Sequence, residues 1–481
     1  MVLLSAASAG DPAGVTAPTQ DFTTAEPLEA LPGGAATSKK HTVDRNAFSQ
    51  PSGNLDFKHE FDFRIGNGIF RKTWVTAPAS TEASDGLGPL FNARACQNCH
   101  LKDGRGHPPS ANWPEDNAIS MLVRLSIPPQ TDAQRMALEK YLISAVDEPV
   151  YGGQLQDFAI QGQNSEGQIH IAYEELPVRF SDGTTVSLRK PAYTITDPGF
   201  GAMHPDVMLS PRVANPMIGL GLLEAVRADD ILALADPDDR DGDGISGRPN
   251  RVWSLEHKKV MLGRFGWKAG QPTIAQQTAA AFAGDMGISS PLMPGGAGDC
   301  TKAQTACLAA PDGNTLRLGS VEASPGMFDL VVFYSRNLAV PRRRGEKDPQ
   351  VLAGKKLFYG SGCISCHRPK FVTGRDGVQP GLAGQLIWPY TDMLLHDMGE
   401  GLADNRPEGA ASGREWRTAP LWGIGLTETV SGHTFFLHDG RARSLEEAIL
   451  WHGGEAEAAK QRVLSMSADD RARLIAFLMS L

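Results

Sequence analysis

Two copies of the motif Cys-x-x-Cys-His constrain this chain more than any other feature. The first copy is Cys96-Gln-Asn-Cys99-His100 and the second is Cys363-Ile-Ser-Cys366-His367. In this motif both thiols can add to the vinyl groups of one haem, and the adjacent histidine then ligates the iron. Cys-x-x-Cys pairs also occur in zinc sites and redox dithiols, but here a histidine follows at once and the motif occurs twice. The sequence therefore predicts two covalently bound haem c groups, with His100 and His367 as proximal ligands.

The length of the chain sets the number of domains expected around those haems. One hydrophobic core rarely extends over 481 residues, so two or more domains are expected. Residues 1–50 are rich in Ala, Thr, Gly and Pro, which predicts a flexible N-terminal lead-in. We expect an N-terminal haem domain over residues 51–340 and a C-terminal haem domain over residues 341–481.

Apolar periodicity gives a coarse prediction of secondary structure. Alternating segments at 168–173, 177–180 and 185–188 predict short strands, in a β-rich insertion at about 150–200. Residues 274–282 and 351–358 have helical periodicity, and Ser467 with Asp470 predicts the start of a terminal helix. The expected fold class is mainly α, with two cytochrome c-like haem domains of which the first carries the insertion.

An internal similarity suggests that the two halves arose by duplication. The segment Arg212–Glu224 resembles the segment Arg417–Glu428, and each follows its own haem motif. Their glycine and proline residues are expected to allow close backbone packing beneath a haem face.

Composition excludes several classes of protein. The formal net charge is -9 and the Lys and Arg residues are scattered, so no nucleic-acid partner is expected. Apolar runs stay short of the roughly 18 residues that a membrane helix requires. The start Met1–Gly10 resembles the tail of a secretory signal, because small residues ending at Ala9 follow a short apolar stretch.

The two cysteines outside the haem motifs support export. Cys300 and Cys307 lie in a Gly, Pro and Thr-rich stretch, and they are predicted to form a small disulfide. Such a bond persists only in an oxidising compartment, which for a bacterial cytochrome is the periplasm.

Four segments stand out around the haem motifs: Cys96–Pro109, Phe265–Thr273, Leu394–Gly399 and Leu437–Gly454. Together they resemble one family, the di-haem oxidoreductases, whose members are named as peroxidases or "thiol oxidoreductases". That family is distantly similar to bacterial di-haem cytochrome c peroxidases and to the di-haem enzyme that matures tryptophan tryptophylquinone. The match to the narrower family covers most of residues 85–481, whereas the match to the peroxidases is confined to the surroundings of each haem motif.

The resemblance implies a second protein ligand for the second haem. In the peroxidases this ligand lies fourteen residues after the histidine of a His-x-Gly turn. Here the turn is His438-Asp-Gly440, and His452 stands at that spacing. Met398 is the competing ligand, because methionine is a common partner in cytochromes c. His396 and His433 are expected at the haem edge or on a propionate.

The same comparison leaves the first haem open. In the peroxidases a tryptophan between the haems is followed ten residues later by a distal glutamine, and here these are Trp267 and Gln277. Ala281 occupies the position that corresponds to His452, and alanine cannot bind iron. Peroxidases carry a catalytic glutamate twenty residues after the tryptophan, but here Gly287 stands there. Asp285 is the candidate acid/base instead, with Glu224 as a second candidate.

Other residues could still ligate the first iron and close that site. His107 follows His100 by only seven residues, which is too close to reach the opposite haem face. Met203, His204 and Met208 lie beyond the β-rich insertion and are the stronger alternatives.

The resemblance implies an enzyme that reduces peroxide with electrons from an external donor, either a small redox protein or a partner protein that is itself the substrate. A distal acid/base would transfer the peroxide proton to the leaving oxygen. Two alternatives stay open: an electron-transfer cytochrome in which both irons are six-coordinate, and a haem-based sensor of a diatomic ligand.

An acidic loop suggests a further metal. Asp239, Asp241 and Asp243 alternate before Gly244, as in the first half of a calcium-binding loop. The glutamate expected at the twelfth position is replaced by Asn250, so a complete EF-hand is not predicted. Calcium is expected here, with a solvated Asp/Gly-rich turn as the alternative.

Overall fold

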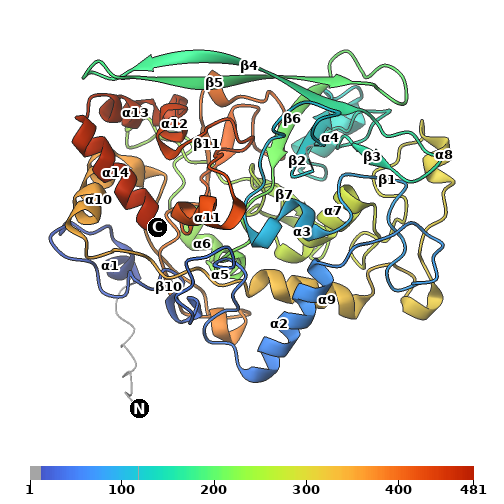
Figure 1. Cartoon of the computed structure of the whole chain (residues 1–481), viewed down its shortest axis with the longest axis horizontal. Helices are drawn as coiled ribbons and strands as arrows, with labels where there is room; N and C mark the ends of the chain where they lie inside the picture. The colour runs from blue at the N-terminus through green and yellow to red at the C-terminus, as the bar shows by residue number, and fades with distance from the viewer. Residues whose placement is uncertain (1–11, 118) are drawn as a thin grey trace.

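The computed structural model describes residues 12–117 and 119–481, and Figure 1 shows their arrangement. The signal-like start Met1–Gly10 lies outside the described residues. Within the described part of the chain, no helix combines the length and the apolar character needed to cross a membrane.

The helices are short and separated by long irregular segments. The fourteen residues of α2 make it the longest of those described. The α-helices are α1 Pro12–Thr16, α2 Phe57–Phe70, α3 Cys96–Cys99, α4 Asp132–Glu139, α5 Leu220–Ala225, α6 Ala228–Leu232, α7 Ile274–Met286, α8 Thr305–Leu308, α9 Pro325–Arg336, α10 Pro349–Gly360, α11 Thr427–Ser431, α12 Leu445–Leu450, α13 Glu457–Leu464 and α14 Ala468–Ser480. The 3₁₀ turns are η1 Gly34–Ala36, η2 Leu101–Asp103, η3 Leu316–Leu318, η4 Cys363–Ser365, η5 Pro380–Leu382, η6 Glu400–Leu402, η7 Ile424–Leu426 and η8 Gly454–Ala456.

The strands pair only in twos, and each pair is antiparallel. The pairs are β1 Leu90–Phe91 with β3 Phe158–Ala159, β2 Met121–Ser126 with β6 Met208–Val213, β4 Gln168–Arg179 with β5 Thr185–Thr196, β7 Arg251–Ser254 with β8 Lys259–Leu262, β9 Phe371–Val372 with β10 Leu386–Ile387, and β11 Leu395–Asp397 with β12 Glu415–Arg417.

The expectation of a mainly α chain built from two cytochrome c-like domains is wrong. Only 29% of the chain is helical and 16% is strand, distributed over many small sheets. The physical reason lies in the composition, since 52 glycines and 33 prolines interrupt regular structure throughout the sequence. Most of the backbone therefore follows loops that pack on one another.

The strongly patterned segments nevertheless form the expected elements. Helix α7 covers the segment predicted at 274–282, and α10 covers the one predicted at 351–358. Helix α14 begins where predicted, because the Ser467 side chain accepts a hydrogen bond from the backbone N–H of Asp470.

The β4–β5 hairpin is the largest strand pair and crosses the molecule along one side, as Figure 1 shows. Its residues Ile169, Ile171 and Leu188 are buried. At its turn, the Ser181 N–H donates to the Leu464 carbonyl and Asp182 pairs with Arg471 at 2.9 Å. The segment at 150–200 is thereby fixed to the C-terminal helices.

Two large hydrophobic clusters fill the interior, and each draws on both halves of the chain. The first is centred on α7 and α9 but includes Phe371 and Trp422. The second is centred on α10 and α14 but includes Met121 and Trp267. The division at residues 340 and 341 stays a prediction, because segments on both sides of it share these cores.

Part of the expected lead-in also packs against the core. Ala36 and Phe48 are buried in the first cluster. Glu29 is fully buried and pairs with both Arg343 and Lys355. The lead-in therefore contacts the start of the C-terminal segment.

The two similar segments pack against each other. Gly219 and Gly423 occupy equivalent positions before short helical turns, with φ of 70° and 74°. A Cβ on Gly219 would lie 2.3 Å from the Trp422 ring, and one on Gly423 would lie 2.6 Å from Ile218. Both glycines are needed because the backbones of the two segments approach each other at the centre of the molecule.

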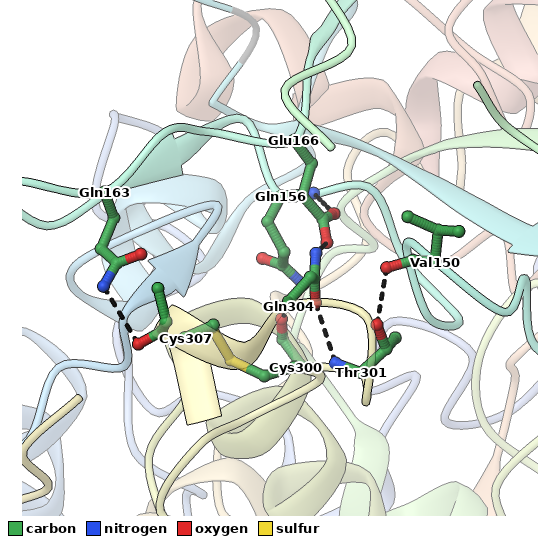
Figure 2. The surroundings of a disulfide bond; sticks show 10 residues. Val150, Gln156, Gln163, Glu166, Cys300, Thr301, Gln304 and Cys307 are labelled. Carbon is green, nitrogen blue, oxygen red and sulfur yellow. Dashed lines mark hydrogen bonds between the residues drawn. A yellow bond between two sulfur atoms is a disulfide. The ribbon is translucent and has the colours of Figure 1, made fainter. Parts of the chain in front are cut away.

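Cys300 and Cys307 form the predicted disulfide (Figure 2), with their Cα atoms 6.0 Å apart. Thr301 Oγ1 donates to the Val150 carbonyl at 2.7 Å, and Gln304 Nε2 donates to Glu166 Oε1. These hydrogen bonds attach the disulfide loop to the segment that leads into the β4–β5 hairpin.

Candidate functional site

The first Cys-x-x-Cys-His motif borders a cavity of about 510 Å³, and Cys96, Cys99 and His100 all line it. His100 Nδ1 donates to the Asn215 carbonyl at 2.7 Å, so Nε2 keeps its lone pair. Burial lowers the pKa of His100 to about 4, which keeps the imidazole neutral. A neutral ring with Nδ1–H engaged in this way has the form of a metal ligand.

Helix α7 supplies another wall of this cavity. Gln277, Ala281 and Asp285 follow one another at four-residue spacing, so they share one face of the helix. All three line the cavity together with the first haem motif. The structure thus brings together the residues that the comparison with peroxidases had predicted, and Ala281 presents only a methyl group.

Asp285 is held by a network of buried amides. Gln154 Nε2 donates to Asp285 Oδ1 at 3.0 Å and to Asn92 Oδ1 at 2.5 Å. Burial raises the pKa of Asp285, while the charge of nearby Arg124 partly opposes that shift. A carboxyl whose pKa lies above the ordinary range exchanges protons closer to neutral pH, as an acid/base catalyst requires.

Trp267 lies where this cavity meets the second half of the chain. Its indole Nε1 donates to the Val213 carbonyl at 2.8 Å, and Arg105 stacks over its ring at 5.3 Å. Its carbonyl accepts a hydrogen bond from the backbone N–H of Arg417 in β12. Trp267 therefore lines the first cavity and contacts a strand whose partner, β11, carries His396.

Glu224 does not line the cavity with the other candidates. Its carboxylate accepts from the Ile274 N–H at 2.8 Å and pairs with Arg336 at 2.6 Å. These contacts fix the start of α7, which makes Glu224 a structural residue in this arrangement.

The alternative ligands for the first iron also lie elsewhere. His107 is exposed and its Nδ1 donates to the Pro108 carbonyl. His204 Nδ1 accepts from the Asp206 N–H, while Met203 and Met208 are half-buried beside the second cluster and in β6. Within the described part of the chain, these four residues are absent from the lining of the first cavity.

The second motif repeats the proximal arrangement. His367 Nδ1 donates to the Tyr390 carbonyl at 2.9 Å, and burial lowers the pKa of His367 to about 4. His452 follows α12, and its Nδ1 donates to the Ala448 carbonyl at 2.7 Å. The charge that His452 carries when protonated would further lower the pKa of His367, so the electrostatic influence of one ring reaches the other. Both rings keep Nε2 available for a metal.

The other candidates at the second site have different partners. His396 is buried between Asp392 and Glu455, with 2.7 Å to each carboxylate, and these charges raise its pKa well above the ordinary range. Its Nδ1 lies 3.6 Å from Cys366 Sγ. An imidazolium held in this way is a poor iron ligand, in agreement with its expected place at the haem edge.

The remaining candidates near the haems are Met398 and His433. Met398 is half-buried beside the second cluster, and its carbonyl faces Gly453, next to His452. His433 Nε2 donates to the Arg105 carbonyl at 3.0 Å, which places His433 near the wall of the first cavity. Met398 therefore lies near His452, which is the predicted iron ligand.

Six arginines line the first cavity, and sequence reasoning missed them. Buried polar atoms without a partner in the described structure include Arg212 Nη2 and Arg406 Nε. Both arginines also pair with Glu408, so what each keeps free is one N–H donor. Haem carries two propionates, and spare arginine donors in a buried cavity suit such anions. No spacing pattern signals these residues, because they come from distant segments: Arg105, Arg124, Arg212, Arg264, Arg406 and Arg417.

The acidic loop gathers a different set of carboxylates from the predicted one. Asp236, Asp239 and Asp241 place one oxygen each within 4.8 Å of the others. Asp243 instead accepts from the Ile245 N–H at 2.8 Å. The predicted member Asp243 thus lies outside the cluster, and Asp236 takes its place.

Comparison with known proteins identifies the family. A solved chain of Kuenenia stuttgartiensis hydrazine synthase shares 13% identity and covers 74% of this chain and 90% of its own length, with a TM-score of 0.26. Curated protein sequences give no match. The family model described as "Di-haem oxidoreductase, putative peroxidase" matches residues 29–481. The chain therefore belongs to the di-haem oxidoreductase family, for which haem is the cofactor.

Proposed function

We propose that this chain is a periplasmic di-haem c-type oxidoreductase of the peroxidase type. The observation that carries the proposal is an asymmetry between the two sites. His452 acts electrostatically on His367 at the second site, whereas the residue of α7 that corresponds to His452 by resemblance is Ala281, on the wall of the first cavity. One site can therefore hold a saturated iron, and the other leaves room for a small oxidant.

The residues that would hold each haem follow from this geometry. Cys96 and Cys99 would form thioethers with the first haem. His100, whose ring is oriented by its hydrogen bond to the Asn215 carbonyl, would ligate the iron. The second haem would be bound by its own motif, Cys363–His367, and His452 would supply a second protein ligand to its iron. When bound, the haem supplies the oxidation–reduction chemistry by which peroxide is cleaved.

The protein's part in the reaction is to handle protons. Reduction of hydrogen peroxide to two waters takes two electrons and two protons, and the electrons come from an external donor. Asp285, in its ionised form, accepts the first peroxide proton and returns it to the leaving oxygen. Gln277 shares a helix face with Asp285 and orients the oxidant by hydrogen bonding. Gln154 fixes the carboxyl group of Asp285 by its bond to Oδ1.

Trp267 is the proposed connection between the two sites. Its indole lines the first cavity and its carbonyl is bonded to β12, which pairs with the strand beside Cys366. An oxidisable ring in this place would pass electrons arriving at the second haem to the first.

Two further parts of the proposal concern location and calcium. The Cys300–Cys307 disulfide supports an oxidising compartment, the periplasm. The cluster of Asp236, Asp239 and Asp241 would offer hard oxygen ligands to calcium. Calcium binding would appear as a rise in the thermal unfolding midpoint on adding calcium, lost on substitution of Asp239 by Asn.

The most direct test introduces an iron ligand into the first cavity. In the variant Ala281→His, an imidazole enters the first cavity at the position equivalent to His452, so peroxide turnover with a reduced donor should be lost. Ala280→His is the matched control, because Ala280 neighbours Ala281 on α7 but does not line the cavity. Turnover that survives in Ala281→His at the wild-type rate would refute the proposal. If the wild-type protein binds small ligands but does not turn over peroxide, it is a sensor. If it neither binds small ligands nor turns over peroxide, it is an electron carrier.

A further inference from the structure

A second hollow, also of about 510 Å³, lies on the other side of the first haem motif. Residues of the segment 38–53 and of α2 form most of its wall, and Gln97 of α3 completes it. Cys96 and Cys99, the neighbours of Gln97 in α3, line the first cavity instead. The short helix α3 therefore separates the two spaces.

The lining of this hollow is strongly cationic. Five of its side chains are positively charged and Glu60 is the one carboxylate, although the whole chain carries a net charge of -9. Arg64 reaches Glu60 only at 4.0 Å, and Lys102 Nζ donates to Asn46 Oδ1. Arg71 and Lys102 both act electrostatically on the buried carboxylate of Asp103. The other two cations that line the hollow are the exposed Lys39 and Lys40.

The floor of the hollow contains an unused hydrogen-bonding group. Ser52 is 3% exposed, and its backbone N–H donates to the Asn337 carbonyl at 2.8 Å. Its hydroxyl has no hydrogen-bond partner among residues 12–117 and 119–481, yet Ser52 lines the hollow. The Ser52 hydroxyl can therefore donate a hydrogen bond to a ligand that enters the hollow.

We propose that the hollow binds a small polyanion with at least two carboxylate or phosphate groups. Cations from three separate segments face one concave space, so a ligand with several negative charges would be attracted to all of them at once. The volume lies in the range of small-molecule sites. The Ser52 hydroxyl would donate to an anionic oxygen at the floor.

Binding there would affect the first haem through α3. A polyanion beside Gln97 places negative charge close to the residues that would attach that haem. Negative charge stabilises the oxidised, more positive iron, so the reduction potential of the first haem falls when the hollow is occupied. This site is independent of the proposed peroxidase activity, since binding requires no turnover.

Calorimetric titration of the holoprotein tests the proposal. The probes are inorganic tripolyphosphate and citrate, which distinguish a phosphate ligand from a carboxylate ligand. We expect at least one to bind, with an affinity that falls as salt is raised. The double variant Arg64→Gln/Arg71→Gln should weaken binding by about tenfold or more, since two charge contacts are lost. Lys58→Gln is the matched control, because Lys58 lies on α2 but not in the hollow.

Each result of the titration either supports or overturns the proposal. Binding of one probe alone supports the proposal and identifies the ligand chemistry. Failure of both probes to bind, or an equal loss of affinity in Lys58→Gln, overturns it. If the arginine variant does not fold, Lys39→Gln/Lys40→Gln provides the same test from the other wall. As a second readout, saturating probe should lower the potential of the first haem in wild-type protein and leave it unchanged in the variant.

Discussion

At the scale of single residues, the proposed chemistry depends on how one carboxyl group is held. Asp285 lies on the inner face of α7, bonded by Gln154 and within the field of Arg124. Burial favours its protonated form, and the arginine charge favours its ionised form. The balance leaves a group that can change its protonation state during a reaction.

Replacing Asp285 by Asn removes this exchangeable proton and nearly preserves the shape of the side chain. Peroxide turnover should fall by about 10²–10⁴-fold, the usual contribution of general acid–base catalysis. The absorption spectrum of the oxidised protein should stay as in the wild type, since no iron ligand changes. Asp329→Asn on the exposed face of α9 should have no effect on either measurement. Unchanged turnover in Asp285→Asn would remove this residue from the mechanism.

The pH profile follows from the same shift. The pKa of Asp285 is raised above its ordinary value of 3.8, and the carboxyl must be ionised to accept the peroxide proton. Turnover should therefore decrease as the pH falls through that raised pKa. The Asn variant should lack this acidic limb, and a profile of kcat/KM against pH would show the difference.

Individual residues were predictable where a fixed spacing or motif identifies them. Both haem motifs, Trp267 and the α7 face from Gln277 to Asp285 were found in this way. The structure places the first motif, Trp267 and that face of α7 around one cavity. Gln154 and the cavity arginines belong to distant segments, so no local pattern reveals them. Glu224 was selected for its acidity, but its carboxylate is occupied by Arg336 and by the backbone N–H of Ile274 at the start of α7.

At the scale of elements, the contacts between short segments depend on glycine. Gly219 has a φ of 70° and lies against the Trp422 ring, while Gly423 lies against Ile218. These reciprocal contacts join the two similar segments, which no pattern within either segment alone could predict. The sequence did locate α7, α10, α14 and the β4–β5 hairpin, because each has clear periodicity or a clear cap.

Gly219→Ala should destabilise the protein by about 2–4 kcal/mol. The left-handed backbone costs a Cβ-bearing residue about 1–2 kcal/mol, and the contact with Trp422 adds strain. Gly68→Ala is the matched control, since Gly68 lies within α2 with open space around it. This control should raise the free energy of unfolding by about 0.5–1 kcal/mol, as measured by denaturant titration. Equal stability of the two variants would contradict the packing described.

The Cys300–Cys307 disulfide closes a short loop and should make a measurable contribution. Constraint of the unfolded chain over a loop of this length is worth about 2–3 kcal/mol. The double variant Cys300→Ser/Cys307→Ser should lose that amount in the free energy of unfolding. Turnover below the unfolding temperature should be kept, because the disulfide does not line the first cavity. A variant as stable as the wild type would show that the loop is held by its hydrogen bonds to Val150 and Glu166.

At the scale of the whole molecule, the two halves share their interior. Each hydrophobic cluster contains residues from both sides of position 340, and the lead-in adds Phe48 and the buried Glu29. The haem motifs had led to an expectation of separate α-helical domains, but a motif fixes only a few residues around its haem. The rest of the fold follows the glycine- and proline-rich loops, whose paths have no periodic signal.

Trp267 is the residue that tests communication across this shared interior. Trp267→Phe keeps the buried ring but loses the bond from Nε1 to the Val213 carbonyl, at a cost of about 1 kcal/mol. After one equivalent of peroxide is added to reduced protein, oxidation of the second haem should be slower than in the wild type. Stopped-flow absorbance would follow it, with Trp253→Phe in β7 as the control. Equal rates in both variants would show that electrons bypass Trp267.

The central claim is that the first iron has a free coordination position while the second has none. Electron paramagnetic resonance of the oxidised holoprotein measures this directly. We expect one high-spin ferric signal, from the haem beside Ala281, and one low-spin signal, from the haem bound by His367 and His452. Two low-spin signals, with a histidine or methionine bonded opposite His100, would contradict it.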